Sequence, residues 1–232
     1  AQTSGPTRNH ANVARVRSGD TPTALRLPLA RYSRHVEPQD VFLSDLAKDA
    51  QENRLALVLG TGFSSATTAG SPTASWIGLL RDGAEYIYGL EGATDRPFLD
   101  VLNKATDTAS LLAAAQYISS KFQGLEGEYS NWLERTVGGL EVAPPASLLN
   151  ALPDVDHILT TNYDTLWRGR FARQPITWTE PNSKTRYFRD PGRYVYHLHG
   201  VYSHPESVVF SGLDYGRSTQ KGDVASVLQQ VA

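Results

Sequence analysis

The chain of 232 residues contains no cysteine and no methionine. Without cysteine, disulfide bonds, zinc sites built from thiolates and a cysteine nucleophile are all excluded. The sequence also has no apolar run of the roughly 18 residues that a membrane helix needs. No charged and then apolar signal peptide opens it. We therefore expect a cytoplasmic protein that does not enter a membrane.

The chain also lacks an excess of positive charge, because 22 lysine and arginine residues stand against 24 aspartate and glutamate residues. A formal net charge of -2 creates no global basic field, so we expect no direct binding of nucleic acid. Hydrophobic residues make up 40% of the chain and charged residues 20%, as in ordinary soluble globular proteins. This composition and length predict one large domain, or one domain with a tail.

Residues 1–36 differ from the rest of the chain in charge. They contain six arginines and a single acid, Asp20, and several glycines and prolines interrupt any helix. We interpret this segment as an arginine-rich N-terminal arm. It either packs loosely or docks on a neighbouring subunit or an acidic partner.

Hydrophobic periodicity predicts an α/β fold for the remainder. Helical spacing occurs in residues 38–53, 75–88, 107–122, 126–137, 144–152 and 222–231. Strand-like runs occupy residues 55–59, 157–161, 194–198 and 207–210, and the first is uniformly apolar, as fully buried parallel strands are. Residues 174–190 are polar and aromatic, which predicts a loop or an edge hairpin. The order of elements is typical of a Rossmann-like, doubly wound parallel sheet with a helical insertion.

Polar clusters stand where three of these strands end. The first is Gly60, Thr61, Gly62, Phe63, Ser64 and Ser65. The second is Thr160, Thr161, Asn162, Tyr163 and Asp164, and the third is His197, Leu198, His199 and Gly200. Because open α/β sheets bind ligands outside the carboxyl ends of their strands, we expect the three clusters to share one crevice.

The first cluster has the chemistry of an anion site. Its backbone N–H groups precede a predicted helix, and Gly60 and Gly62 let the backbone approach a pyrophosphate without a Cβ clash. Ser64 and Ser65 can add hydroxyl donors. The alternative, a tight turn whose glycines serve only the backbone, stays open.

The other two clusters carry candidate catalytic groups. His199 has an ordinary pKa near neutrality, which suits a general base, and Gly200 beside it would leave room for a ligand. Asn162 and Asp164 either face a ligand or serve the backbone, as an Asx-turn and a helix cap. Strand alternation places His197 on the same face as His199, where we expect it to flank the site.

In their order, the three clusters resemble the sirtuin family, specifically its bacterial sirtuin-like branch. There a Gly-x-Gly-x-Ser turn, a Thr-Thr-Asn-Tyr-Asp segment and a Leu-His-Gly segment recur, and the resemblance covers roughly residues 54–215. Thr61 replaces the alanine that is usual in the family. Trp76 lies further along the chain from the glycine turn than the corresponding tryptophan of the family does. Thr161 stands where sirtuin deacylases have glutamine. The resemblance implies a sirtuin-like NAD-binding domain over residues 37–232. That domain would be incomplete at its C-terminal end, since the family normally adds another strand there.

The resemblance also implies a reaction, the cleavage of NAD to nicotinamide and ADP-ribose without a metal. Asn162 would position the nicotinamide ribose or the attacking water, and His199 would act as base. Asp164 would contact the carboxamide. The remaining residues expected to bind NAD are Gly60, Thr61, Gly62, Phe63, Ser64, Ser65, Trp76, Thr161 and Gly200. Members of this branch deplete NAD in antiphage defence, as homo-oligomers or together with a sensor domain or partner protein.

Three alternatives stay open at this point. A sirtuin-like fold could hold NAD or ADP-ribose as a sensor without turnover. A deacylase is disfavoured, because the four cysteines of the usual zinc module are absent. A metal hydrolase built on His197 and His199 would need further ligands, and the sequence offers none at a recognisable spacing.

Overall fold

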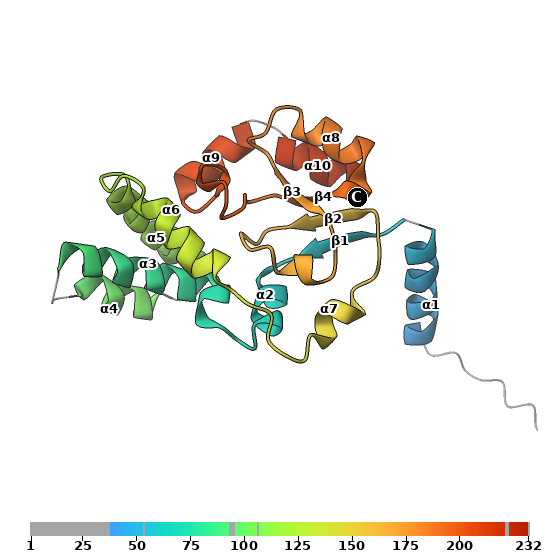
Figure 1. Ribbon diagram of the computed structural model, residues 1–232, viewed down its shortest axis with the longest axis horizontal. Helices are drawn as coiled ribbons and strands as arrows, with labels where there is room; N and C mark the ends of the chain where they lie inside the picture. Colours follow the sequence, from blue (N-terminus) through green and yellow to red (C-terminus); the bar gives the residue numbers. More distant parts are fainter. Residues whose placement is uncertain (1–37, 53, 93–95, 106, 221–222, 232) are drawn as a thin grey trace, which may run out of the picture. The chain divides into compact units, whose positions relative to one another are not determined.

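The computed structural model describes residues 38–52, 54–92, 96–105, 107–220 and 223–231, and the predicted N-terminal arm lies outside them. Four parallel strands form one sheet in the order β1-β2-β4-β3 (Figure 1). Their bounds are β1 Ala56–Leu59, β2 His157–Thr160, β3 Gln174–Thr177 and β4 Tyr194–His197. The predicted Rossmann-like α/β class is confirmed, and all four strands direct their carboxyl ends toward the same edge of the sheet.

Helices account for most of the described chain. They are α1 Pro38–Gln51, α2 Thr61–Thr67, α3 Trp76–Glu91, α4 Pro97–Lys104, α5 Thr108–Phe122, α6 Glu128–Leu133, α7 Ser147–Ala151, α8 Ser183–Arg189, α9 Gly212–Gln220 and α10 Asp223–Val231. A π-helical turn, Glu134–Gly138, extends α6. In the described residues, none of the helices combines the length and the apolarity that a membrane crossing requires.

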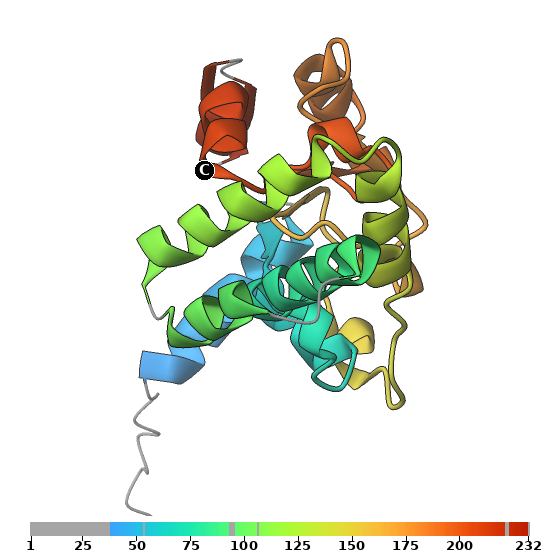
Figure 2. The same ribbon diagram turned by 90° about the vertical axis from the view of Figure 1, so that its left-hand side faces the viewer.

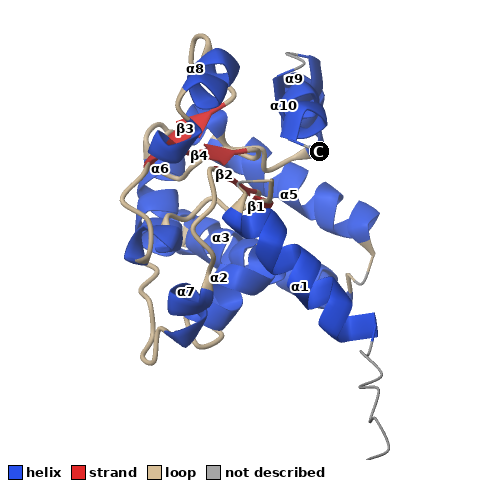
Figure 3. Cartoon of the chain, turned by 90° about the vertical axis from the view of Figure 1, so that its right-hand side faces the viewer, coloured by secondary structure: helices blue, strands red, loops and turns tan. Residues whose placement is uncertain are grey.

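Helices cover both faces of the sheet because the strands are apolar on both sides. Ile158 and Val195 pack on one face with side chains of α2 and α7. Their neighbours Leu159 and Tyr196 pack on the other face with α8 and α10 (Figures 1 and 3). This alternation is the pattern of a doubly wound sheet.

The predicted helical insertion lies between β1 and β2 and contains α3 to α6 (Figure 2, green). Its core is centred on Trp132, which is fully buried and stacks on Phe122 with ring centroids 5.1 Å apart. Asp82 of α3 accepts hydrogen bonds from Trp132 Nε1 at 2.7 Å and from Thr136 Oγ1 at 3.0 Å. These bonds hold the π-helical turn, and with it Val137, against α3.

Two strand predictions are wrong. Residues 207–210 form no strand, because Val209 N donates to His199 O and Phe210 N donates to Asp214 Oδ2 instead of to a ladder. Residues 174–177, expected in a loop or an edge hairpin, form the parallel edge strand β3 and are followed by α8. Pro175 is tolerated there because an edge strand has one side without ladder bonds.

The first strand is also less buried than its sequence predicts. β1 pairs only with β2 in the described sheet, and Val58 is 56% exposed. A uniformly apolar run predicts burial on both faces but does not reveal whether a strand is central or at an edge.

Candidate active site

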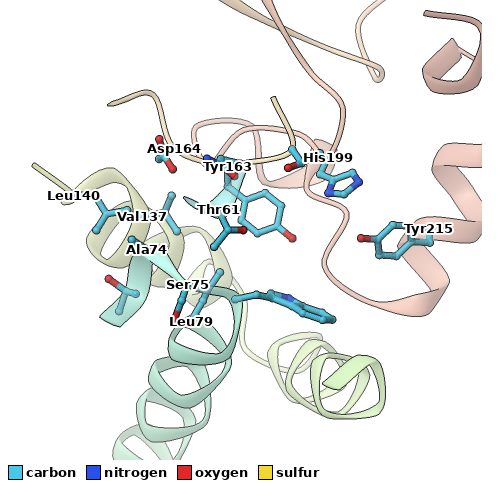
Figure 4. Close-up of a pocket in the computed structure, with 14 residues that line it drawn as sticks. Thr61, Ala74, Ser75, Leu79, Val137, Leu140, Tyr163, Asp164, His199 and Tyr215 are labelled. Carbon is cyan, nitrogen blue, oxygen red and sulfur yellow. The ribbon is translucent and has the colours of Figure 1, made fainter. Parts of the chain in front are cut away.

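One cavity of about 190 Å³ lies where β1, β2 and β4 end (Figure 4). Its walls come from all three predicted clusters, from the start of α3, from the π-helical turn and from α9. The lining residues are Thr61, Thr73, Ala74, Ser75, Trp76, Leu79, Val137, Leu140, Thr161, Asn162, Tyr163, Asp164, His199 and Tyr215. Six of the predicted site residues are therefore brought together: Thr61, Trp76, Thr161, Asn162, Asp164 and His199.

The remaining predicted residues lie behind the cavity wall or beside it. Phe63 is part of the apolar core under the sheet, and Ser64 is buried. Gly60 and Ser65 are half-buried, and Gly62 is exposed at the start of α2. Only Thr61 of this cluster lines the cavity directly.

Gly200 has a different role from the one we expected. Its φ is +83°, and a Cβ built on it would lie 2.1 Å from the backbone oxygen of Ser207. The space beside Gly200 is therefore filled by the protein and is not room for a ligand. Glycine is required there because the turn that carries His199 is left-handed and packs tightly on Ser207.

Buried hydrogen bonds join the first two clusters. The side-chain amide nitrogen Nδ2 of Asn162 donates to Gly60 O at 2.8 Å and to Ser64 Oγ at 2.6 Å. Ser64 Oγ in turn donates to Asp164 Oδ2 at 2.5 Å. The side chains of the β2 end thus tie down the turn that follows β1.

This network orients the Asn162 side chain. Both N–H bonds of its amide are used inside the protein, so its carbonyl oxygen Oδ1 is the atom left for a ligand in the cavity. The Asx-turn considered for Asn162 is replaced by these contacts across the sheet.

For Asp164, the sequence left open whether the side chain serves the backbone or faces a ligand. Its Oδ1 accepts a hydrogen bond from Leu166 N at 3.1 Å, next to the 3₁₀ helix Leu166–Gly169, and the residue also lines the cavity. Burial raises the pKa of this carboxyl, although the bonds from Ser64 and Leu166 act in the opposite direction.

His199 stands in the turn after β4, with its ring edge-on to Tyr215 at a centroid distance of 5.3 Å (Figure 4). Burial lowers its pKa below the ordinary value, so the imidazole is neutral at pH 7. Among the described residues, no side chain is hydrogen-bonded to its ring. Its backbone oxygen accepts from Val209 N at 2.8 Å, which fixes the turn but leaves both ring nitrogens available to a ligand.

His197 is the last residue of β4 and is not among the residues that line the cavity. His197 is 0% exposed, and its Nδ1 lies 3.0 Å from Asn162 O and 3.2 Å from Gly200 O. In the part of the chain that the structure describes, no group of three or more potential metal ligands occurs.

Sequence reasoning missed several lining residues. Tyr163 lay inside a predicted cluster but was assigned no role. Its hydroxyl donates to Val209 O at 2.8 Å and joins the β2 end to the segment after β4. Tyr215 could not be found because α9 was not predicted. Ser75 caps α3 by accepting a hydrogen bond from Gly78 N at 3.1 Å, a signal that the Ser-Trp sequence contained.

The parallel sheet defines a Rossmann-like fold, and the cavity lies at the carboxyl ends of its strands, the edge where such folds bind ligands. Residues 156–232 match the family model of the SIR2-like domain. The chain is also 27% identical over 190 residues to the NAD(+) hydrolase ThsA of Bacillus cereus (strain MSX-D12). That alignment covers 79% of this chain and 36% of ThsA, so the chain spans little more than a third of that relative. The stretch that resembles the SIR2-like domain contains β2, β3 and β4 and the second and third polar clusters.

Proposed function

We propose that this protein is an NAD glycohydrolase, which cleaves the bond between nicotinamide and ribose in NAD. The observation that carries the proposal is the single cavity that gathers Asn162, Asp164 and His199 at the ends of neighbouring parallel strands. The likeness to a protein named NAD(+) hydrolase supports the same substrate. The products would be nicotinamide and ADP-ribose.

The dimensions of the cavity suit one end of the dinucleotide. Its volume of about 190 Å³ is below the roughly 300–1,000 Å³ of most ligand pockets, so it would enclose the nicotinamide and its ribose only. Trp76, Leu79 and Val137 offer apolar contact to a flat ring. The pyrophosphate would lie outside, over the exposed backbone of Thr61 and Gly62 at the start of α2.

The proposed chemistry needs one base and one orienting group. When the C–N bond breaks, its electron pair stays on the nicotinamide nitrogen and neutralises the positive charge of the ring. A water oxygen bonds to the ribose carbon, and the proton that it loses passes to neutral His199. Asn162 Oδ1, left free by the network behind it, would accept a hydrogen bond from that water or from a ribose hydroxyl.

The test is NAD consumption by the purified chain, with nicotinamide release followed by chromatography. His199→Ala and Asn162→Ala are expected to abolish release, while His204→Ala, at an exposed histidine outside the cavity, serves as the matched control. Equal turnover by the wild type and both site variants would exclude the proposed roles.

A non-catalytic sensor of NAD or ADP-ribose is the second candidate. It is favoured by the absence, among the described residues, of a carboxylate that orients the His199 ring, since most general-base histidines have such a partner. A sensor would be protected by NAD or ADP-ribose against thermal unfolding and would release no nicotinamide.

We extend the proposal to the cellular role. The enzyme would deplete NAD in bacterial antiphage defence, as a homo-oligomer or with a sensor domain or partner protein, and residues 1–36 would form its docking arm. Cells that express the wild type are expected to lose NAD on phage infection, and cells that express His199→Ala are expected to keep it. Unchanged NAD in infected wild-type cells would reject the defence role while leaving the enzymatic proposal to the assay above.

A further inference from the structure

His197 is a fully buried polar residue that the proposed chemistry does not use. It is the last residue of β4, and its Nδ1 faces two backbone oxygens, Asn162 O at 3.0 Å and Gly200 O at 3.2 Å. One of these oxygens belongs to a candidate catalytic residue. The other belongs to the residue that directly follows His199.

The surroundings of His197 determine which nitrogen carries its proton. Carbonyl oxygens only accept hydrogen bonds, so Nδ1 must be the donor. Nε2 is buried and has no hydrogen-bond partner among the described residues, and the nearest ring, Trp167, has its centroid 6.0 Å away. A proton on Nε2 would be a buried donor without an acceptor, which is costly. The imidazole is therefore neutral and held as the Nδ1–H tautomer.

The position of this N–H lies between two backbone links that join the ends of β2 and β4. Before it, Leu198 N donates to Thr160 O at 2.8 Å, and beyond it, Tyr202 N donates to Tyr163 O at 2.9 Å. Between these links, where Asn162 and His199 stand, the shared N–H of His197 bridges the two loops.

We propose that His197 is a positioning residue for NAD hydrolysis, whose Nδ1–H holds the backbone of Asn162 and the turn of His199 in register. It stays neutral throughout and exchanges no proton with the substrate. The inference rests on the proposed function, because the two positioned residues are those assigned to water and ribose.

Paired substitutions test this role. His197→Asn keeps an N–H donor near the position of Nδ1, whereas His197→Leu keeps bulk without a donor. Misplacement of reacting groups by about 1 Å can cost on the order of 100-fold in rate, so we expect His197→Leu to lower kcat by roughly 10- to 100-fold. KM should change by less than about threefold, and His197→Asn should recover most of kcat with the acid limb of the wild-type pH profile.

Two kinetic outcomes would overturn the inference. One is a His197→Leu variant as active as the wild type. The other is a folded His197→Asn variant as inactive as His199→Ala, or one that has lost the acid limb of the pH profile, since either would mean that His197 itself exchanges the proton. If His197→Leu does not fold, the His197→Asn result alone decides between these readings.

A measurement without turnover separates this inference from the proposed function. ¹⁵N NMR of the wild-type histidines should show one imidazole protonated at Nδ1 alone, unchanged between pH 7 and pH 5 and absent from His197→Asn. A His197 signal that carries its proton on Nε2, or that titrates near pH 6.5, would overturn the inference whether or not NAD is hydrolysed. A wild-type chain that gives the expected signal but no turnover would reject only the proposed function.

Discussion

The two sides of the cavity differ in how their polar groups are satisfied. The strand-end network, formed by Ser64, Asn162, Asp164 and His197, is at most 8% exposed and is tied together by hydrogen bonds. The open rim, formed by Thr61, Trp76, His199 and Tyr215, is partly exposed. Among the described residues, no hydrogen bond is made by the side chains of these four rim residues. The hydrogen bonds of the strand-end network hold its side chains in position, while the polar side-chain atoms of the open rim are left to bind a ligand.

This contrast predicts the largest effect for a change in the rim. His199→Ala should lower kcat by about 100- to 10,000-fold, the usual contribution of a general base. The melting temperature should move by no more than about 2 °C, because the ring makes no hydrogen bond inside the protein. Nicotinamide release checks the expected loss of kcat, and thermal denaturation checks the unchanged melting temperature, each measured beside His204→Ala. A large loss of stability would place His199 with the network.

The next effect concerns the backbone that joins the two sides. Gly200→Ala should destabilise the fold by roughly 2–4 kcal/mol, because alanine is strained at a φ of +83° and its Cβ would meet the backbone of Ser207. Gly192→Ala is the control, since a Cβ there meets nothing within 4 Å. Urea denaturation measures the free energy of unfolding of both variants. Equal values for Gly200→Ala and Gly192→Ala would contradict the tight packing of Gly200 on Ser207.

Within the network, Ser64→Ala should destabilise the fold by about 1–3 kcal/mol, because it removes the hydroxyl that donates to the buried Asp164 Oδ2 and that accepts one of the two hydrogen bonds of the Asn162 side-chain amide. The neighbouring Ser65→Ala, with no side-chain hydrogen bond in the described structure, should stay within about 0.5 kcal/mol of the wild type. We also expect lower turnover for Ser64→Ala alone. Loss of turnover without loss of stability would assign Ser64 to the ligand.

The smallest effect is a pH dependence of stability. Burial, ahead of the two carbonyl contacts that oppose it, lowers the pKa of His197 from 6.5 to about 4. The unfolded chain then binds this proton first, so stability is present above pH 6.5 and falls as the pH drops toward 4. Between pH 6.5 and 5.5 the loss should be about 1 kcal/mol.

His197→Asn removes this titration and serves as its control. Asp164, whose pKa is raised, has a pH dependence of opposite sign, but it is present in both proteins and cancels in the difference. Denaturation curves of wild type and variant that stay parallel over this pH range would contradict a buried neutral histidine.

The sequence predicted what depends on local pattern. Three strands and the polar clusters that follow them could be predicted, because parallel strands are apolar throughout and their carboxyl ends carry the site. Tertiary features were not readable. Val58 is exposed because β1 has one partner in the described sheet, residues 207–210 give their backbone bonds to loops, and Tyr215 stands on α9, which lacks clear periodicity.

The sequence identified several residues of the candidate site but not the role that each of them has in the structure. Thr61, Asn162 and His199 could be named because their residue types and positions suit a ligand. The burial of Ser64 and the packing role of Gly200 depend on partners far away or in a later turn, which no local pattern encodes. The contacts of His197 with Asn162 O and Gly200 O likewise depend on segments outside its own strand.

The most direct test of this division is nicotinamide release from NAD by the purified wild-type chain, beside His199→Ala, with thermal stability measured on the same samples. We expect steady release by the wild type, none above background by the variant, and equal melting temperatures. A wild-type chain that NAD protects against heat, yet that releases no nicotinamide, would contradict it and identify the rim as a binding surface.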